Sequence, residues 1–255
     1  MNSNNKQYID TLRQYAGEFV VIVLGVLAAF AIDRWSDDRR DRELEESYLV
    51  RLKGDLSRDL EQVGFARWAS FAQARATTTL LYSINDPLAA EVPIFTKSSE
   101  SIDFSVPATE VIDGATMGGL VWLSFRTRTL NPSRGTYDEM LATGRFLVIN
   151  DDQLRGSVID YYSYVEDSEQ LGVWISESTE RLQTVLRPTG LNAFDYTYVD
   201  DPIPRLRELD EVGAALRDIR RRSLRYVSFL EQARDKARAL VARIDEKTGQ
   251  QGEAG

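Results

Sequence analysis

The sequence predicts a mainly α-helical protein in which an N-terminal transmembrane helix continues into a multi-helix bundle with a small irregular or β insertion. Three patterns indicate this. Residues 19–32 form an unbroken, mostly apolar run without charge, apolar residues recur at helical spacing along later segments, and four of the seven prolines fall within residues 85–132. The predicted organisation is a polar tail (1–14), a transmembrane helix (15–33), a helical domain (34–247) and a disordered tail (248–255).

The apolar run is long enough to cross a bilayer. As a helix, residues 15–32 would reach roughly 27 Å, which is close to the roughly 30 Å hydrocarbon core. Tyr15 and Trp35 flank the run, as is typical of membrane interfaces. Three residues are candidates for contact with another membrane helix: Glu18, which lies about one turn inside, and the small pair Gly25 and Ala29.

Two other interpretations of this segment stay open. Ala29, Phe30 and Ala31 have the A-x-A form of a signal-peptide cleavage site, although Glu18 interrupts the apolar lead. A buried helix of a soluble protein is the second, and it would need protein on every side. Basic residues near the run number two before it and four after it, which nominally favours a cytoplasmic domain. An N-terminal anchor or a signal peptide would instead place the domain outside.

Composition excludes several kinds of chemistry. The chain has no Cys and no His, so Cys-His and Ser-His-Asp nucleophile systems and His-ligated zinc are impossible within it. The net charge of −9 lies entirely beyond Ile32, and an acidic domain repels nucleic acid. We therefore expect no catalytic residues, no metal, no cofactor and no nucleic-acid partner.

Helical periodicity continues after the apolar run. A stripe of Leu44, Tyr48, Leu52, Leu56 and Leu60 predicts that the membrane helix and the next segment form one long helix, weakened at Gly54 and Gly64. Within the insertion, alternating apolar residues at 102, 104 and 106 suggest a short strand, and residues 117–125 a short helix or strand.

Three further helices are predicted towards the C-terminus. Thr136 is the expected cap of a helix over residues 137–143 that Gly144 ends. Residues 150–152 begin a helix that runs to Leu186, before Pro188. The last segment, from Leu209 to Ile244, has a three-four apolar spacing that needs a partner helix, inside the domain or in a second subunit.

Two blocks of sequence resemble a family of uncharacterised bacterial single-span membrane proteins. The first contains Gly17-Glu18-Phe19-Val20-Val21 and the rest of the apolar run with Asp33-Arg34-Trp35, followed by Tyr48-Leu49-x-Arg51-Leu52-x-x-Asp55-Leu56. The second is Thr136-Tyr137-Asp138-Glu139-Met140-Leu141-Ala142-Thr143-Gly144. The resemblance implies an uncleaved anchor in the bacterial inner membrane with the large domain in the periplasm. It implies no activity.

Two groups of residues are candidate sites. The motif turn consists of Tyr137, Leu141, Gly144, Leu147, Tyr161 and Tyr162, which packing alone would also explain. The arginine cluster consists of Arg217, Arg220, Arg221, Arg222 and Arg225, which would either bind an anionic ligand or pair with Asp218, Glu231 or the acidic first helix. Asp151 and Asp152 are expected to cap a helix, and Glu166, Asp167 and Glu169 fall on different faces of one helix.

These observations favour a membrane-anchored, non-enzymatic interaction or scaffold protein. Its expected partners are the lipid bilayer and another protein, or a second copy, bound through helix pairing. The alternative is a sensor-like helical domain that binds a small anionic ligand near the arginine cluster. Hydrolysis by carboxylates alone is a third, less favoured hypothesis.

Overall fold

The computed structural model describes residues 3–90 and 116–253, and within them the side chains other than those of residues 3–22, 169 and 250–253. This part of the chain is mainly helical and contains no strand. The predicted helical bundle is therefore confirmed. The strand expected at residues 102–106 and the side chain of Glu18 lie outside the described part.

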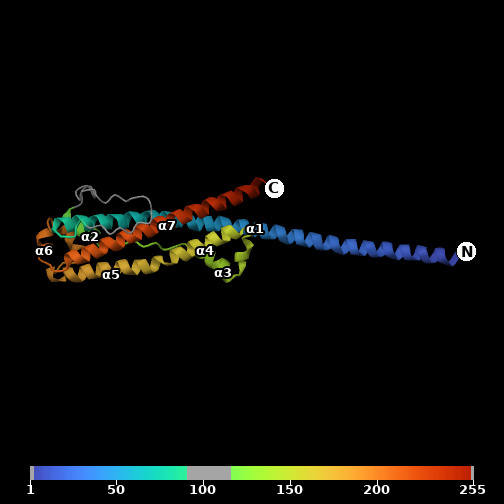
Figure 1. The fold of residues 1–255 in the computed structure, drawn as a ribbon, viewed down its shortest axis with the longest axis horizontal. Helices are drawn as coiled ribbons and strands as arrows, with labels where there is room; N and C mark the ends of the chain where they lie inside the picture. The colour runs from blue at the N-terminus through green and yellow to red at the C-terminus, as the bar shows by residue number, and fades with distance from the viewer. Residues whose placement is uncertain (1–2, 91–115, 254–255) are drawn as a thin grey trace.

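Helix α1 (Ser3–Ser83) is a single helix of 81 residues. Its first half projects away from the rest of the molecule, and its second half forms one side of the bundle (Figure 1). The prediction of one long N-terminal helix is correct. The weakening expected at Gly54 and Gly64 does not occur, because the leucine stripe is packed along its length, with Leu52 and Leu56 completely buried.

The remaining long helices pack beside α1. Helices α4 (Asp152–Glu166) and α5 (Ser168–Leu186) follow one another along the bundle, and α7 (Val212–Glu253) returns antiparallel to α1 (Figure 1). The α1–α7 contact is the most extensive, and α7 also contacts α4 and α5. The partner that the apolar seam of α7 requires is thus supplied within the chain.

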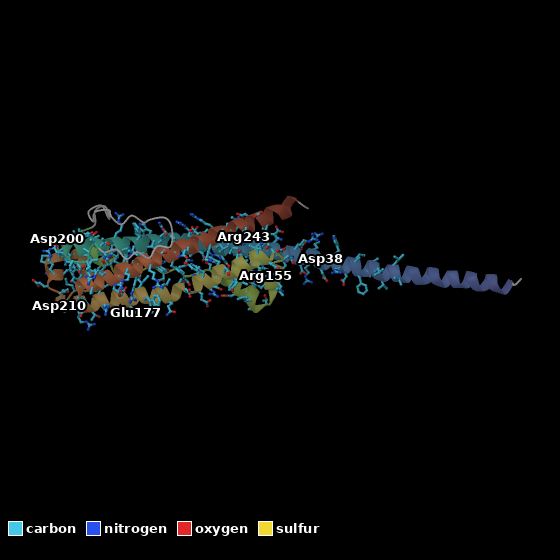
Figure 2. All side chains as sticks on the ribbon, in the orientation of Figure 1. Asp38, Arg155, Glu177, Asp200, Asp210 and Arg243 are labelled. Carbon is cyan, nitrogen blue, oxygen red and sulfur yellow. The ribbon has the colours of Figure 1, made fainter. Side chains whose placement is uncertain are left out.

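Short elements complete the two ends of the bundle. Helix α3 (Gly135–Ala142) and the 3-10 turn η2 (Arg145–Val148) lie at the end from which α1 leaves. Helix α2 (Met117–Leu123), the 3-10 turns η3 (Arg187–Thr189) and η4 (Asp195–Tyr198), and α6 (Ile203–Arg207) lie towards the opposite end. Asp200 and Asp210 mark that far end, whereas Arg155 and Arg243 lie near the exit of α1 (Figure 2).

Two apolar cores are separated by a buried polar layer. One core surrounds Tyr48, Leu56, Tyr161 and Leu230, and the other surrounds Leu80, with residues of α2, α5 and α7. Between them, the side-chain amide of Gln73 donates to the carbonyl oxygen of Ser124 at 2.8 Å and accepts from the hydroxyl of Ser223 at 2.7 Å. Each of these buried polar groups has a hydrogen-bond partner, so burying them does not carry the free-energy cost of an unpaired polar group. The layer therefore fixes the register of α7 on α1.

Three predicted boundaries need correction. The helix expected from residue 150 to Leu186 is divided at Asp167, although both parts bury apolar residues against the bundle, among them Val158 and Ile175. Residues 248–253, expected to be disordered, continue α7. Thr136 is not the cap of α3, which begins at Gly135, two residues earlier than predicted, with Arg134 at the N-cap position.

In the described part of the chain, no helix contains a stretch that is long and apolar enough to cross a membrane. Side chains are described only from Val23 onward, so the first eight residues of the predicted span, 15–22, lie outside this finding. From Val23 to Glu43 every side chain of α1 is exposed, including Leu24, Leu27 and Phe30.

Gly118 provides a test of the packing at the far end of the bundle. A Cβ atom at this position would overlap the carbonyl oxygens of Tyr196 and Val199. We expect Gly118→Ala to lower the free energy of unfolding by about 1–3 kcal/mol, the usual cost of overpacking. Equilibrium urea unfolding of the full chain, followed by circular dichroism, measures this change.

Gly156 is the matched control. It lies inside α4 and nothing stands within 4 Å of an added Cβ. Gly156→Ala should therefore raise the free energy of unfolding by about 0.5–1 kcal/mol, because alanine loses less backbone entropy in a helix. Equal effects of the two substitutions would contradict the close packing of α2 on η4.

Candidate functional site

The motif turn is held on α1 by buried carboxylates. Asp55 accepts a hydrogen bond from the backbone N–H of Thr136 at 3.1 Å, and Asp59 accepts one from the N–H of Ser133 at 2.7 Å. Arg134, the N-cap residue of α3, supplies no side-chain cap. The N-terminus of α3 is therefore capped from another helix, whereas the sequence predicts Thr136 for this role.

A second set of contacts joins the two sequence blocks that carry the family resemblance. Tyr48 donates to Glu139 at 3.1 Å, and Arg51 donates to both carboxylate oxygens of Glu139. The hydrogen bond from Arg51 lowers the pKa of Glu139 most, and the hydrogen bond from Tyr48 lowers it further. The blocks are 91 residues apart at Tyr48 and Glu139, and they form one structural unit. We call these contacts, with those of Asp55 and Asp59, the clasp.

Glu45 extends the clasp towards the exit of α1. It is completely buried and accepts hydrogen bonds from the backbone N–H of Asn150 at 3.0 Å and from its side-chain amide at 3.4 Å. The ammonium group of Lys247 on α7 lies 3.9 Å from the same carboxylate. One side chain of α1 therefore positions both the start of α4 and the end of α7.

The aromatic members of the motif turn form a packed group. The rings of Tyr137 and Tyr162 stack with centroids 4.4 Å apart, and Tyr161 meets Tyr162 edge to face at 5.1 Å. The hydroxyl of Tyr161 donates to Asp59 at 2.7 Å, and that of Tyr162 donates to the carbonyl of Ser133 at 3.1 Å. Burial and the nearby Asp59 raise the pKa of both tyrosines. These side chains brace the turn.

The remaining members of the motif turn face outward. Gly144 has φ of +67°, a left-handed conformation that favours glycine, as expected at a helix end. Leu141 is 51% exposed and Leu147 is 74% exposed, so neither packs in the core. The turn is thus a rigid backbone that presents two apolar side chains to the surroundings.

The arginine cluster is divided between structural and exposed positions. Arg217 pairs with Asp86, and Arg220 is buried and donates to the carbonyl oxygens of Leu88 and Ala89. Arg222 pairs with Asp218 as expected. Glu231, the other expected partner, pairs instead with Arg67 of α1 at 2.9 Å.

Arg221 and Arg225 remain on the surface. Both are exposed and line a cavity of ≈ 300 Å³ between α5 and α7, together with Trp174. The guanidinium of Arg225 lies 5.4 Å from the centroid of the Trp174 ring. Trp174 belongs to no sequence motif, and a single aromatic residue in an amphipathic helix does not by itself indicate a binding site.

The acidic residues considered as sites have other roles. Asp151 is the N-cap of α4 and accepts from the N–H groups of Leu154 and Gln153, which lower its pKa. Asp152 pairs with Arg155. Within the described side chains, no three potential ligands lie close enough together to hold a metal ion.

Sequence reasoning missed the carboxylates Glu45 and Asp59. Their signal was available, since both stand near the buried leucine stripe of α1, and a carboxylate there needs partners. Of the predicted membrane contacts, Gly25 and Ala29 are exposed, and Glu18 lies outside the described side chains.

Comparison of the chain with protein-family models, with curated proteins and with solved structures finds no match.

Asp59 makes the clasp sensitive to pH. Burial raises its pKa above the ordinary value of 3.8, although hydrogen bonds from Ser133 and Tyr161 act in the opposite direction. At a pH between the ordinary pKa and this raised pKa, Asp59 is protonated in the folded protein and ionised in the unfolded chain. As pH rises from about 4 through the raised pKa, the free energy of unfolding should fall, and Asp59→Asn should remove this slope.

Urea unfolding at a series of pH values measures this effect as the difference between wild type and variant. Asp151→Asn is the control of opposite sign. Because the pKa of Asp151 is lowered, its contribution is present at neutral pH and is lost as pH falls through that lowered pKa. If the difference in free energy of unfolding between wild type and Asp59→Asn does not change with pH above pH 4, the raised pKa of the buried Asp59 carboxyl group is contradicted.

Proposed function

We propose that the protein is a membrane-anchored, non-enzymatic scaffold that presents an interaction surface at a fixed position relative to the bilayer. The observation that carries this proposal is the continuity of α1. The apolar segment and the bundle share one helix from Ser3 to Ser83, with no break between them. A helix of this kind transmits position and orientation, which is the mechanical requirement of a scaffold.

The exposure of α1 supports the anchor. Between Val23 and Ile32 apolar side chains are exposed around the whole helix, with Leu27 at 58% and Phe30 at 67%. Such a surface is unfavourable in water and is stabilised by lipid or by other helices. The charged side chains that follow, from Asp33 to Glu43, are also exposed, as expected for a helix leaving the bilayer.

The clasp supports the scaffold role. It fixes the backbone of the motif turn through buried hydrogen bonds, while Leu141 and Leu147 remain exposed on it. A rigid turn with apolar side chains binds a protein partner at low entropic cost, because little ordering is needed on binding. The partner is another membrane protein or a second copy of this chain, at the inner membrane of a bacterium, with the bundle in the periplasm.

Charge in the apolar segment tests the anchor. Leu24→Arg/Leu27→Arg should move the chain from the membrane to the soluble fraction, because each arginine at a helix centre costs about 2.5–3.5 kcal/mol on insertion. Ser36→Arg/Ser47→Arg adds the same charge to exposed positions beyond the segment and should leave the chain in the membrane. Carbonate extraction followed by immunoblotting measures the distribution.

Two results would contradict the anchor. One is recovery of the wild-type chain as soluble material without detergent. The other is a mature chain that begins at Ile32, detected by mass spectrometry, which would show cleavage after the A-x-A sequence. Protease access from each side of the membrane tests the periplasmic placement.

Site-specific photo-crosslinking tests the scaffold role. A benzoyl-phenylalanine at Leu147 should give a discrete protein adduct in intact cells, because this side chain is the most exposed of the turn. The same group at Val173, which is 56% exposed on α5, is the matched control and should give none. Leu141→Ser should weaken the Leu147 adduct several-fold. No adduct, or identical adducts from both positions, would contradict an interaction through the turn.

A further inference from the structure

The seam between α5 and α7 carries two adjoining hollows. The first has a volume of ≈ 300 Å³, with Leu171, Ile175 and Tyr226 among its apolar lining. The second has a volume of ≈ 700 Å³ and includes Tyr164 and Phe229. Leu171, Trp174 and Arg225 line both, so the contact between Arg225 and Trp174 divides one continuous groove. Glu177, which lies on α5 (Figure 2), also lines the first hollow.

Arg222 fixes one wall of the first hollow. Its guanidinium donates to the carbonyl oxygen of Trp174, and it lies 3.1 Å from Asp218 and 3.3 Å from Glu177. One arginine thus holds the backbone at Trp174 in place and offsets the charge of the acidic side chains that line the hollow. The wall is formed before any ligand arrives, which lowers the entropic cost of binding.

Arg221 and Arg225 point to the kind of ligand. Within the described side chains, neither has a carboxylate within 4 Å, whereas Arg217 and Arg222 on the same helix are paired with acids. The chain carries a net charge of −9, so carboxylates are abundant. A guanidinium presents a planar fork of donors that matches a carboxylate, and here two such groups stand beside an apolar floor.

We propose that this hollow binds a small organic anion, namely a carboxylate attached to a single aromatic ring or an apolar body of similar size. The carboxylate pairs with Arg221 and Arg225, and the ring lies against Trp174, Leu171 and Ile175. The volume is at the lower end of the range for small-molecule sites, which favours a one-ring ligand. Arg225 exchanges its weak cation–π contact for a charge-assisted hydrogen bond.

This inference does not depend on the membrane anchor, and the two fail separately. The test uses the full chain as it is purified, in lipid nanodiscs when it is recovered from the membrane and in buffer alone when it is recovered soluble. The chain is labelled with 5-fluorotryptophan at its four tryptophans. The Trp174 resonance is assigned with Trp174→Phe. Benzoate and phenylacetate are the probes, and benzamide is the neutral comparison. Trp35 and Trp68, both exposed and outside the groove, report non-specific partition.

We expect benzoate or phenylacetate to shift the Trp174 fluorine resonance saturably, while Trp35 and Trp68 stay unchanged. Arg221→Gln/Arg225→Gln should weaken this binding at least tenfold, because two charge-assisted hydrogen bonds are lost. Arg238→Gln is the control for a general effect of charge, since it removes one positive charge from an exposed part of α7 outside both hollows, and it should bind as the wild type does.

Three results would overturn the proposal. The first is equal affinity for benzoate and benzamide, which would make the hollow merely apolar. The second is no shift of Trp174 at tens of millimolar probe. The third is an equal loss of affinity in Arg238→Gln, which would indicate a general effect of charge.

Discussion

The buried face of α1 is the constraint on which the rest of the structure depends. It combines a leucine stripe that packs on α7 with carboxylates that hold the turn and the start of α4. Burying a carboxylate is costly unless hydrogen-bond donors surround it. Asp55 and Asp59 meet this requirement with backbone N–H groups that α3 and its approach leave without partners. The carboxylates of α1 therefore gain hydrogen-bond donors, and the N–H groups of the turn gain acceptors. These contacts fix the position of the turn on α1.

Much of this fold can be predicted from the periodicity of apolar residues, whereas the clasp can be predicted only in part. The stripe at Leu44, Tyr48, Leu52 and Leu56 predicts a long helix with one buried face, because helical spacing depends on neighbouring residues alone. The cap of α3 by Asp55 joins positions 81 residues apart, which no local pattern encodes. The family resemblance selected both blocks, but it gave no reason for them to touch.

The arginine cluster shows a second limit of sequence reasoning. Five arginines within nine residues look equivalent in the sequence, yet α7 turns them towards different neighbours. Arg217 and Arg220 reach the segment after α1, Arg222 reaches α5, and Arg221 and Arg225 face the groove. Which ones pair with acids depends on the packing of α5 beside α7. The sequence predicts the cluster, and the fold decides its roles.

The rigidity of α1 links the proposed anchor to the position of each surface. At about 1.5 Å per residue, Glu45 stands about 20 Å beyond Ile32, and Asp59 about 40 Å. The hydrogen bond between Gln73 and Ser223 sets the level of Arg221 and Arg225, about 60 Å beyond Ile32. With the apolar segment in the bilayer, a partner of the motif turn must therefore extend well beyond the membrane surface. The groove, farther still, would meet small solutes more readily than lipid, which agrees with a ligand that diffuses rather than one that is embedded.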